Sequence, residues 1–170
     1  MALTLLRHTT PDVARGTCYG VTDLSLAKGF EQEIEQALSG LSAPTAIISS
    51  PLTRCLRLAE GAAHQFGLEV TVASHWQEMD FGRWEGQGWS SIPRAELDAW
   101  ADDFMGYDGH GGESVTALEA RVRQGLADAP EGALIVTHMG CIKAALSITG
   151  DPDGWKRQMG FGENLRISAT

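Results

Sequence analysis

Short apolar runs alternate with amphipathic segments along this chain, and this alternation constrains the fold more than any other feature. The apolar runs lie at residues 3–6, 45–49, 69–73 and 133–137. Runs of this length predict buried strands, and the segments between them carry apolar residues at helical spacing. Strands that alternate with helices predict an α/β fold, here a three-layer α/β/α sandwich with a mostly parallel central sheet.

Local signals set the expected boundaries of the other elements. A first helix is expected to start near Ser25. Ser50 and Pro51 suit the N-cap and first turn of a second helix, which Gly67 would end. Further helices are expected at about 93–100, 115–126 and 140–149, an edge strand at 164–168, and a loop rich in glycine and tryptophan at 76–91.

Length and composition suit one globular domain. The chain has 170 residues, of which 43% are hydrophobic and 21% charged, so it can bury a core without disulfides or a structural metal. We expect a single domain over residues 1–170, with a small lid within about 79–112. The three cysteines have no Cys-x-x-Cys spacing, so reduced thiols are expected rather than a redox or zinc motif.

Charge and hydropathy narrow the expected partners. No apolar run approaches the roughly 18 residues of a membrane span, and the first apolar stretch is too short for a signal peptide, so a cytoplasmic location is expected. A net charge of −9 disfavours nucleic acid and anionic membranes as partners. A small phosphorylated metabolite remains a suitable partner if the few basic residues converge on one pocket. The edge strand and the five tryptophans suit a homodimer and a monomer equally.

Polar side chains follow three of the predicted strands. The first strand ends at Arg7 and His8, and the strongest one ends at Thr137 and His138. The second strand is followed by a helix that carries Arg54 in its first turn. Ligands of open α/β sheets bind beyond the carboxyl ends of the strands, so these two histidines and two arginines are expected to face one crevice.

These residue types suit a phosphoryl group. The fork of an arginine binds phosphate oxygens in pairs, and a neutral histidine is a nucleophile near pH 7. Helix N-termini add oriented N–H groups. The other histidines, His64, His75 and His110, fall on predicted loop or surface positions, and no carboxylate cluster accompanies them. We therefore expect neither a metal nor a cofactor.

Five motifs resemble those of the histidine phosphatase superfamily, also called phosphoglycerate mutase-like, and together they cover most of the chain. In chain order they are Leu-Leu-Arg7-His8-Thr9, Ser-Ser-Pro-Leu-Thr-Arg54-Cys, the loop Glu78 to Gly86, Gly-Gly-Glu113-Ser, and Val-Thr-His138-Met-Gly. The resemblance implies that His8 attacks phosphorus and becomes phosphohistidine. It also implies that Arg7, Arg54 and His138 hold the phosphoryl oxygens.

The resemblance assigns the general acid to Glu78, which would protonate the leaving alcohol and then activate water. Such proton transfer contributes about 10²–10⁴-fold to the rate. Asp80 and Glu85 lie in the same loop and are rival acids. Met139 stands where the acid phosphatase branch has its aspartate, so that branch is disfavoured.

Two departures from the superfamily pattern bear on function. Thr9 replaces the usual glycine after Arg-His, and its hydroxyl could donate to the phosphate. Mutases of this type clamp a substrate carboxylate with basic residues between the strands, but here only Arg94, with Arg83 just before, stands in an acidic stretch. A mutase is therefore disfavoured, and a metal-independent phosphomonoester hydrolase is the expected function.

The segment 16–26 resembles that of the α-ribazole phosphatases of cobalamin synthesis. The expected substrate-binding residues are Arg7, Thr9, Tyr19, Arg54, His138 and Met139. Tyr19, Trp84 and Trp89 could stack on a ring-bearing substrate or serve only in packing. A broad-specificity phosphatase and a protein phosphohistidine phosphatase remain alternatives. The alternative from another functional class is a non-catalytic module that binds phosphate without turnover.

Overall fold

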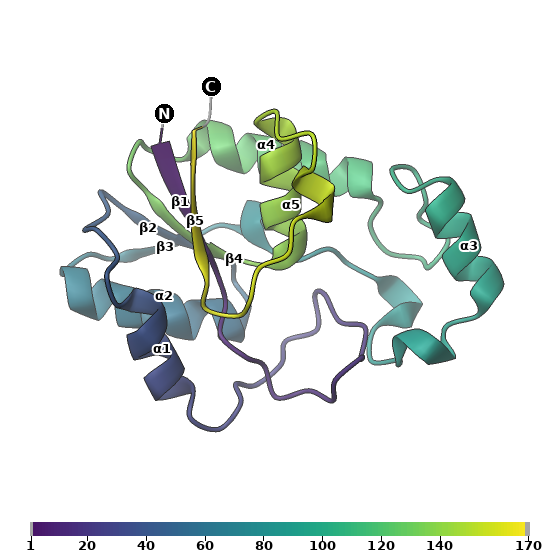
Figure 1. Cartoon of the computed structure of the whole chain (residues 1–170), viewed down its shortest axis with the longest axis horizontal. Helices are drawn as coiled ribbons and strands as arrows, with labels where there is room; N and C mark the ends of the chain where they lie inside the picture. Colours follow the sequence, from purple (N-terminus) through teal and green to yellow (C-terminus); the bar gives the residue numbers. More distant parts are fainter. Residues whose placement is uncertain (1, 169–170) are drawn as a thin grey trace.

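A five-stranded sheet forms the centre of the molecule in the computed structural model, which describes residues 2–168. Its strands are β1 (Ala2–Arg7), β2 (Ile47–Ser49), β3 (Val70–Val72), β4 (Leu134–Thr137) and β5 (Asn164–Ser168), in the order β3-β2-β4-β1-β5. The first four run parallel, whereas β5 pairs antiparallel with β1 at the edge (Figure 1). The predicted mostly parallel sheet and its edge strand are confirmed.

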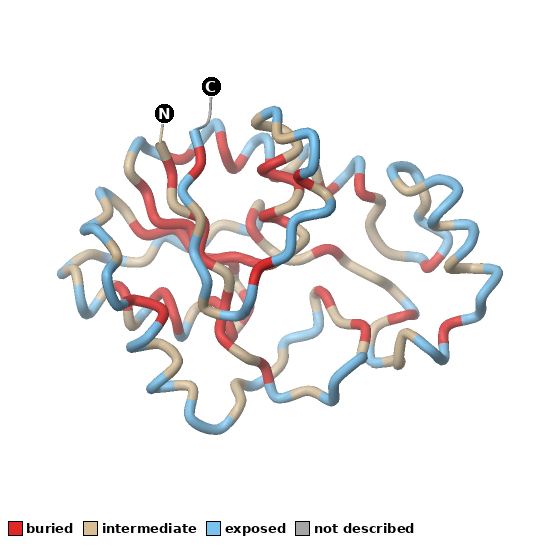
Figure 2. Tube along the Cα trace, in the orientation of Figure 1, coloured by how far each residue is buried: buried red, intermediate tan, exposed pale blue. Residues whose placement is uncertain are grey.

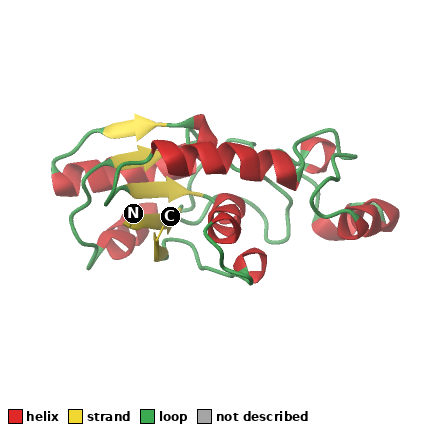
Figure 3. Ribbon diagram, turned by 90° about the horizontal axis from the view of Figure 1, so that it is seen from above, coloured by secondary structure: helices red, strands yellow, loops and turns green. Residues whose placement is uncertain are grey.

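Helices cover both faces of this sheet, as Figure 3 shows from above. On one face lie α1 (Phe30–Leu38) and α2 (Thr53–Phe66), and on the other α4 (Val115–Asp128) and α5 (Met139–Ile148). Alternate residues of one strand serve the two faces: Leu5 packs with α4 and α5, and Leu6 with α2. Burial is concentrated along the strands and the helix faces that touch them (Figure 2). The expected three-layer sandwich is therefore present.

The segment between β3 and α4 extends away from the sheet and carries α3 (Arg94–Asp102) (Figure 1). It also contains the short 3₁₀ helices Gly82–Trp84 and Trp89–Ser91. Two further 3₁₀ helices are Ser74–Trp76, shortly after β3, and Gly154–Lys156, between α5 and β5. The projecting segment has its own small core, which contains Trp84 and Ile92, against which Tyr107 packs. The range 79–112, within which a small lid is predicted, lies in this segment between β3 and α4.

Several sequence expectations were wrong in detail. The first helix starts at Phe30 rather than near Ser25, because the Ser25 carbonyl accepts a hydrogen bond from Asp12 instead. The second helix starts at Thr53, and Ser50 lies outside its turns. His110, expected at a loop surface, is only 1% exposed, because it packs against Trp84 with ring centroids 4.8 Å apart. Part of the predicted loop at 76–91 forms 3₁₀ turns.

Across residues 2–168, no helix has the length and apolar character needed to cross a bilayer.

Candidate active site

Arg7 and His8 lie where β1 ends, beside the end of β4. Arg7 pairs in register with Thr137, and the His8 main-chain N–H donates to the Thr137 carbonyl at 3.0 Å. The His8 ring nitrogen Nδ1 lies 2.7 Å from the main-chain oxygen of Thr9. Since a carbonyl oxygen can only accept, Nδ1 carries the proton and Nε2 keeps its lone pair. The local chain thus fixes His8 in the tautomer that a nucleophile needs.

His138 follows β4, and its ring centroid lies 5.1 Å from that of His8. Its Nε2 is 2.7 Å from the hydroxyl oxygen of Ser50 and 3.3 Å from Sγ of Cys55. The Ser50 hydroxyl oxygen also accepts from the N–H of Leu52 at 3.3 Å. Ser50 therefore links the His138 ring to the backbone just before α2.

Arg54 projects from the first turn of α2 and is fully buried. Its guanidinium donates to the carbonyls of Gly20 at 2.6 Å and Thr22 at 2.8 Å, and it lies over the ring of Tyr19, 5.3 Å from the centroid. Gly20 is required here because a Cβ would stand 1.7 Å from the main-chain oxygen of Met79. The loop after β1 and the first turn of α2 are therefore held together at the site.

Arg7 is held by a segment near the C-terminal end of the chain. One guanidinium nitrogen donates to the carbonyl of Met159, and the guanidinium carbon lies 4.1 Å from the ring centroid of Phe161. The same ring lies 5.4 Å from the His8 ring. Residues 159–162 thus cover Arg7 and His8, a contact that no motif indicated.

Three buried donors at this site have no hydrogen-bond partner among the residues that the structure describes. They are Nε of Arg7, the hydroxyl of Thr9 and Nε of Arg54. A buried donor left unsatisfied costs about 1–3 kcal/mol. Guanidinium and hydroxyl groups of this kind are donors that an oxyanion such as phosphate accepts from, so their presence suits a phosphoryl group. Thr9 replaces glycine without strain, since no residue other than glycine has a positive φ among those described.

Burial favours the neutral form of both histidines. Burial, together with the charge of Arg54, lowers the pKa of His8 to about 3. Burial also holds the pKa of His138 well below its usual value, with His8 and Arg54 adding to the effect. A neutral His8 has the lone pair that attack on phosphorus requires.

Glu78 follows the 3₁₀ helix Ser74–Trp76, and its carboxylate lies at the N-terminus of α5. One oxygen accepts from the N–H of Met79 at 2.9 Å and the other from the N–H of Gly140 at 3.1 Å. Gly140 permits this approach, because a Cβ there would stand 2.2 Å from the nearer carboxylate oxygen. A carboxyl group is therefore held beside the second residue after His138.

A cavity of about 310 Å³ opens beside His8. Its polar lining includes Arg7, His8, Tyr19, Glu78 and Lys143, and Met139 also lines it. The opposite wall is aromatic and consists of Phe81, Trp89, Trp100, Phe104 and Trp155. Trp89 and Trp100 are nearly parallel, 10° apart. The cavity is therefore lined by both charged groups and aromatic rings, whereas the predicted binding residues Thr9, Arg54 and His138 are fully buried and do not line it.

Not every predicted residue lines this cavity. Trp84, considered as a stacking residue, is 1% exposed and donates to the carboxylate of Glu96 at 2.6 Å, so it belongs to the core of the projecting segment. Arg83 also pairs with Glu96, at 2.8 Å, and Arg94 pairs with Asp98 at 2.7 Å. Neither arginine lines the cavity that contains His8.

The rival acids have other partners. Asp80 accepts from the N–H of Gly82 at 2.8 Å and lines a different cavity, together with Glu113. Glu85 accepts from the N–H groups of Val21 and Thr22, both at 2.9 Å. Of the three carboxylates, Glu78 is the one that lines the cavity beside His8.

Sequence reasoning missed several residues at the site. Lys143 lies one turn into α5 and lines the cavity, half-buried and without an ion pair among residues 2–168; burial lowers its pKa, which Glu78 opposes. Its position, five residues after His138 on a helix that starts at Met139, was the available signal. Trp155 and Phe161 come from a stretch with no motif, so only the fold brings them to the site.

The sequence profile of the histidine phosphatase superfamily (branch 1) matches residues 3–169. The chain therefore belongs to the histidine phosphatase superfamily, a family of phosphatases, as its motifs predicted.

Individual relatives agree with this membership. The probable phosphoglycerate mutase GpmB of Salmonella paratyphi C is 33% identical over 157 residues, which cover 84% of this chain and 73% of that protein. The bifunctional protein Rv2228c of Mycobacterium tuberculosis is 34% identical over 114 residues, 62% of this chain. The match covers 31% of that protein, so it spans about a third of the relative's length.

Solved structures share the fold over nearly the whole chain. TTHB049 from Thermus thermophilus is 29% identical with a TM-score of 0.83, covering 99% of this chain and 94% of that one. The mycobacterial glucosyl-3-phosphoglycerate phosphatase Rv2419c is 26% identical with a TM-score of 0.80, covering 97% of this chain and 88% of that one.

Proposed function

We propose that this chain hydrolyses phosphomonoesters through a phosphohistidine intermediate on His8, without a metal ion. The observation that carries the proposal is the free Nε2 of a buried His8 that lies within the electrostatic reach of Arg54 and Arg7, each of which has an unpartnered buried Nε. Cationic and N–H donors supply there the charge stabilisation that a metal supplies in other phosphatases. Membership of the histidine phosphatase superfamily supports the same chemistry.

The reaction takes two in-line displacements. In the first, the Nε2 lone pair of His8 attacks phosphorus, the ester P–O bond breaks, and the carboxylic acid of Glu78 gives its proton to the leaving oxygen. The Nδ1 proton stays hydrogen-bonded to the Thr9 carbonyl, which supports the positive ring. In the second, water gives a proton to the Glu78 carboxylate and attacks phosphorus, the N–P bond breaks, and phosphate leaves. Arg7, Arg54 and His138 bind the phosphoryl oxygens throughout.

The aromatic wall of the cavity favours a leaving group that carries a ring. Rings within reach of Trp89 and Trp100 gain from stacking as well as from burial. α-Ribazole 5'-phosphate, whose leaving group carries a fused aromatic ring, is the substrate we put first. The resemblance of segment 16–26 to the α-ribazole phosphatases supports this choice. Tyr19, which belongs to that segment, lines the cavity.

A second candidate is favoured by Lys143. An unpaired cation at the cavity wall would bind a carboxylate or hydroxyl groups of the leaving group. Sugar phosphates and phosphorylated glycerate derivatives have such groups, and one structural relative is a glucosyl-3-phosphoglycerate phosphatase. A phosphohistidine peptide and a broad substrate range remain the further alternatives for this open cavity.

Hydrolysis of p-nitrophenyl phosphate in the presence of a chelator tests the reaction class. We expect turnover without added metal, and none in His8→Ala. Tight phosphate binding without turnover would instead support a non-catalytic module, and dependence on added metal would contradict the histidine mechanism. A panel of α-ribazole phosphate, sugar phosphates, phosphoglycerate and phosphohistidine peptides then separates the substrate candidates.

A further inference from the structure

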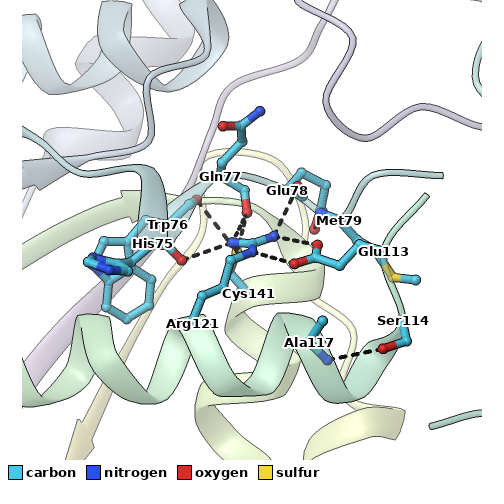
Figure 4. A network of polar contacts seen from close by, with 10 residues as sticks. All are labelled: His75, Trp76, Gln77, Glu78, Met79, Glu113, Ser114, Ala117, Arg121 and Cys141. Carbon is cyan, nitrogen blue, oxygen red and sulfur yellow. Dashed lines mark hydrogen bonds and ion pairs between the residues drawn. The ribbon is translucent and has the colours of Figure 1, made fainter. Parts of the chain in front are cut away.

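Arg121 and Glu113 form a fork-to-fork ion pair behind the site (Figure 4). Nε of Arg121 lies 2.7 Å from one carboxylate oxygen of Glu113, and one terminal nitrogen lies 2.9 Å from the other. Both side chains are largely shielded, with 22% and 17% of their surfaces exposed. Paired geometry of this kind is stronger and more directional than a single contact.

Besides a 3.9 Å contact with Sγ of Cys141, the remaining donors of the same guanidinium go to the carbonyls of one short segment. They reach the carbonyl of His75 at 2.9 Å, that of Gln77 at 2.6 Å and that of Glu78 at 3.1 Å. All five N–H donors of Arg121 are therefore used, and three of them bind the backbone that leads into Glu78 (Figure 4). Lysine has no planar fork and could not reproduce this set.

Arg121 does not line the cavity beside His8, so its main route to the reaction is the segment that it binds. Burial disfavours the charged form of Arg121. The hydrogen bonds from Arg121 to the Glu113 carboxylate outweigh this effect, so the pKa of the guanidinium is raised above its usual value. The backbone at Glu78 is thus fixed from behind by Arg121. Its carboxylate is fixed in front by Gly140.

We propose that the Arg121–Glu113 pair is a positioning device that sets the reach of the Glu78 carboxyl toward the leaving oxygen. This inference rests on the proposed function. Displacement of a catalytic group by about 1 Å can cost about 10²-fold in rate. The pair should therefore govern hydrolysis of esters that need a proton donor, and matter little for esters whose leaving group departs as an anion.

The test compares kcat/KM for an alkyl phosphate and for p-nitrophenyl phosphate in Arg121→Lys and in Glu113→Gln. We expect both variants to lose about 10- to 100-fold on the alkyl ester and at most about threefold on the nitrophenyl ester. A purely structural role would lower both rates together, because it would reduce only the amount of folded enzyme. If Arg121→Lys does not fold, Glu113→Gln, which keeps the shape of the side chain, carries the same prediction.

The matched control is Arg123→Lys, an arginine on the same helix that is exposed and has no hydrogen-bond partner in the described chain. It should leave both rates unchanged. Adding Arg121→Lys to Glu78→Gln should cost no further activity on the alkyl ester, because the two changes act on one group. Equal slowing of both esters, or an additive double variant, would overturn the inference. Wild-type enzyme without a phosphorylated His8 would overturn the proposed function itself.

Discussion

The carboxylate of Glu78 accepts a hydrogen bond from the main-chain N–H of Gly140 at 3.1 Å. Glu78 comes from the loop that follows β3, and Gly140 from the first turn of α5, directly after the β4 strand end that carries His138. This contact ties the proposed proton donor to the strand end that carries His138, which we propose binds the phosphoryl group.

Gly140→Ala should displace Glu78 while leaving the phosphate end intact. The added Cβ would stand 2.2 Å from a carboxylate oxygen of Glu78, and the flexible side chain would move rather than the helix. We expect hydrolysis of alkyl phosphates to fall about 10- to 100-fold, with p-nitrophenyl phosphate much less affected. Steady-state kinetics on the two esters measure this effect. Unchanged hydrolysis of the alkyl ester would show that Glu78 is not the proton donor.

Ser50→Ala should slow every substrate to a similar degree. It removes the hydroxyl 2.7 Å from Nε2 of His138, and with it a hydrogen bond that orients the ring. We expect a fall in kcat/KM of about 10- to 100-fold, whatever the leaving group, by analogy with the loss of second-layer hydrogen bonds at other histidines.

Ser49→Ala is the control for that change. Ser49 is a neighbouring buried serine whose hydroxyl donates to the Ser50 carbonyl at 2.9 Å and has no hydrogen bond to His138. Activity should stay close to that of the wild type. Selective loss on alkyl esters in Ser50→Ala would contradict a role in phosphate binding.

The pKa of His8, lowered to about 3, predicts that its imidazole stays neutral from pH 8 down to about pH 4. Titration of the His8 ring, followed by its NMR chemical shifts, should show no change near pH 6.5, the usual pKa of a histidine. Titration of His8 near 6.5 would contradict its burial as a neutral nucleophile.

The same depressed pKa predicts how stability changes with pH. Between about 6.5 and about 3 the unfolded chain binds a proton at His8 that the folded chain does not bind. The free energy of unfolding is therefore unaffected by His8 protonation above about pH 6.5, and it decreases as the pH falls below that value. Each such histidine lowers the free energy of unfolding by up to about 1.4 kcal/mol per pH unit in this window. Chemical denaturation of wild type and His8→Asn should show a shallower acid dependence in the variant.

Lys143→Met should change substrate preference without disabling the reaction. The variant keeps the length of the side chain but removes the unpaired charge from the cavity wall. We expect KM for anionic or hydroxyl-rich esters to rise about 10- to 100-fold, as for loss of one hydrogen bond to a charged group, with p-nitrophenyl phosphate unaffected. Lys156→Met, at an exposed lysine paired with Asp153, is the control. If Lys143→Met and the wild type have equal KM values for every ester, Lys143 takes no part in substrate recognition.

The sequence predicted the features that depend on strand ends. Arg7, His8 and His138 were expected at neighbouring strand ends because parallel strands present their carboxyl ends at one edge, and the structure brings them there. The helix start at Ser50 was wrong for a physical reason, since the Ser50 hydroxyl bonds to His138. That partner lies 88 residues away in the chain, so local capping rules could not anticipate it.

Other parts of the site depend on packing between distant segments. Arg121 appears in the sequence as one more polar residue on an amphipathic helix, and only the fold turns it toward the segment before Glu78. Phe161 reaches Arg7 because β5 returns alongside β1. Trp84 and Trp89 could not be told apart by sequence, because residue type alone does not say which ring faces the cavity.

Trapping of the phosphoenzyme tests the central claim most directly. Wild-type protein is mixed with ³²P-labelled phosphomonoester, quenched within the first turnover in alkali, and digested for mass spectrometry. We predict one labelled site, on the His8 imidazole, which accumulates further in Glu78→Gln and is absent in His8→Ala. A label on another residue, or burst-free turnover with unlabelled His8, would contradict the mechanism.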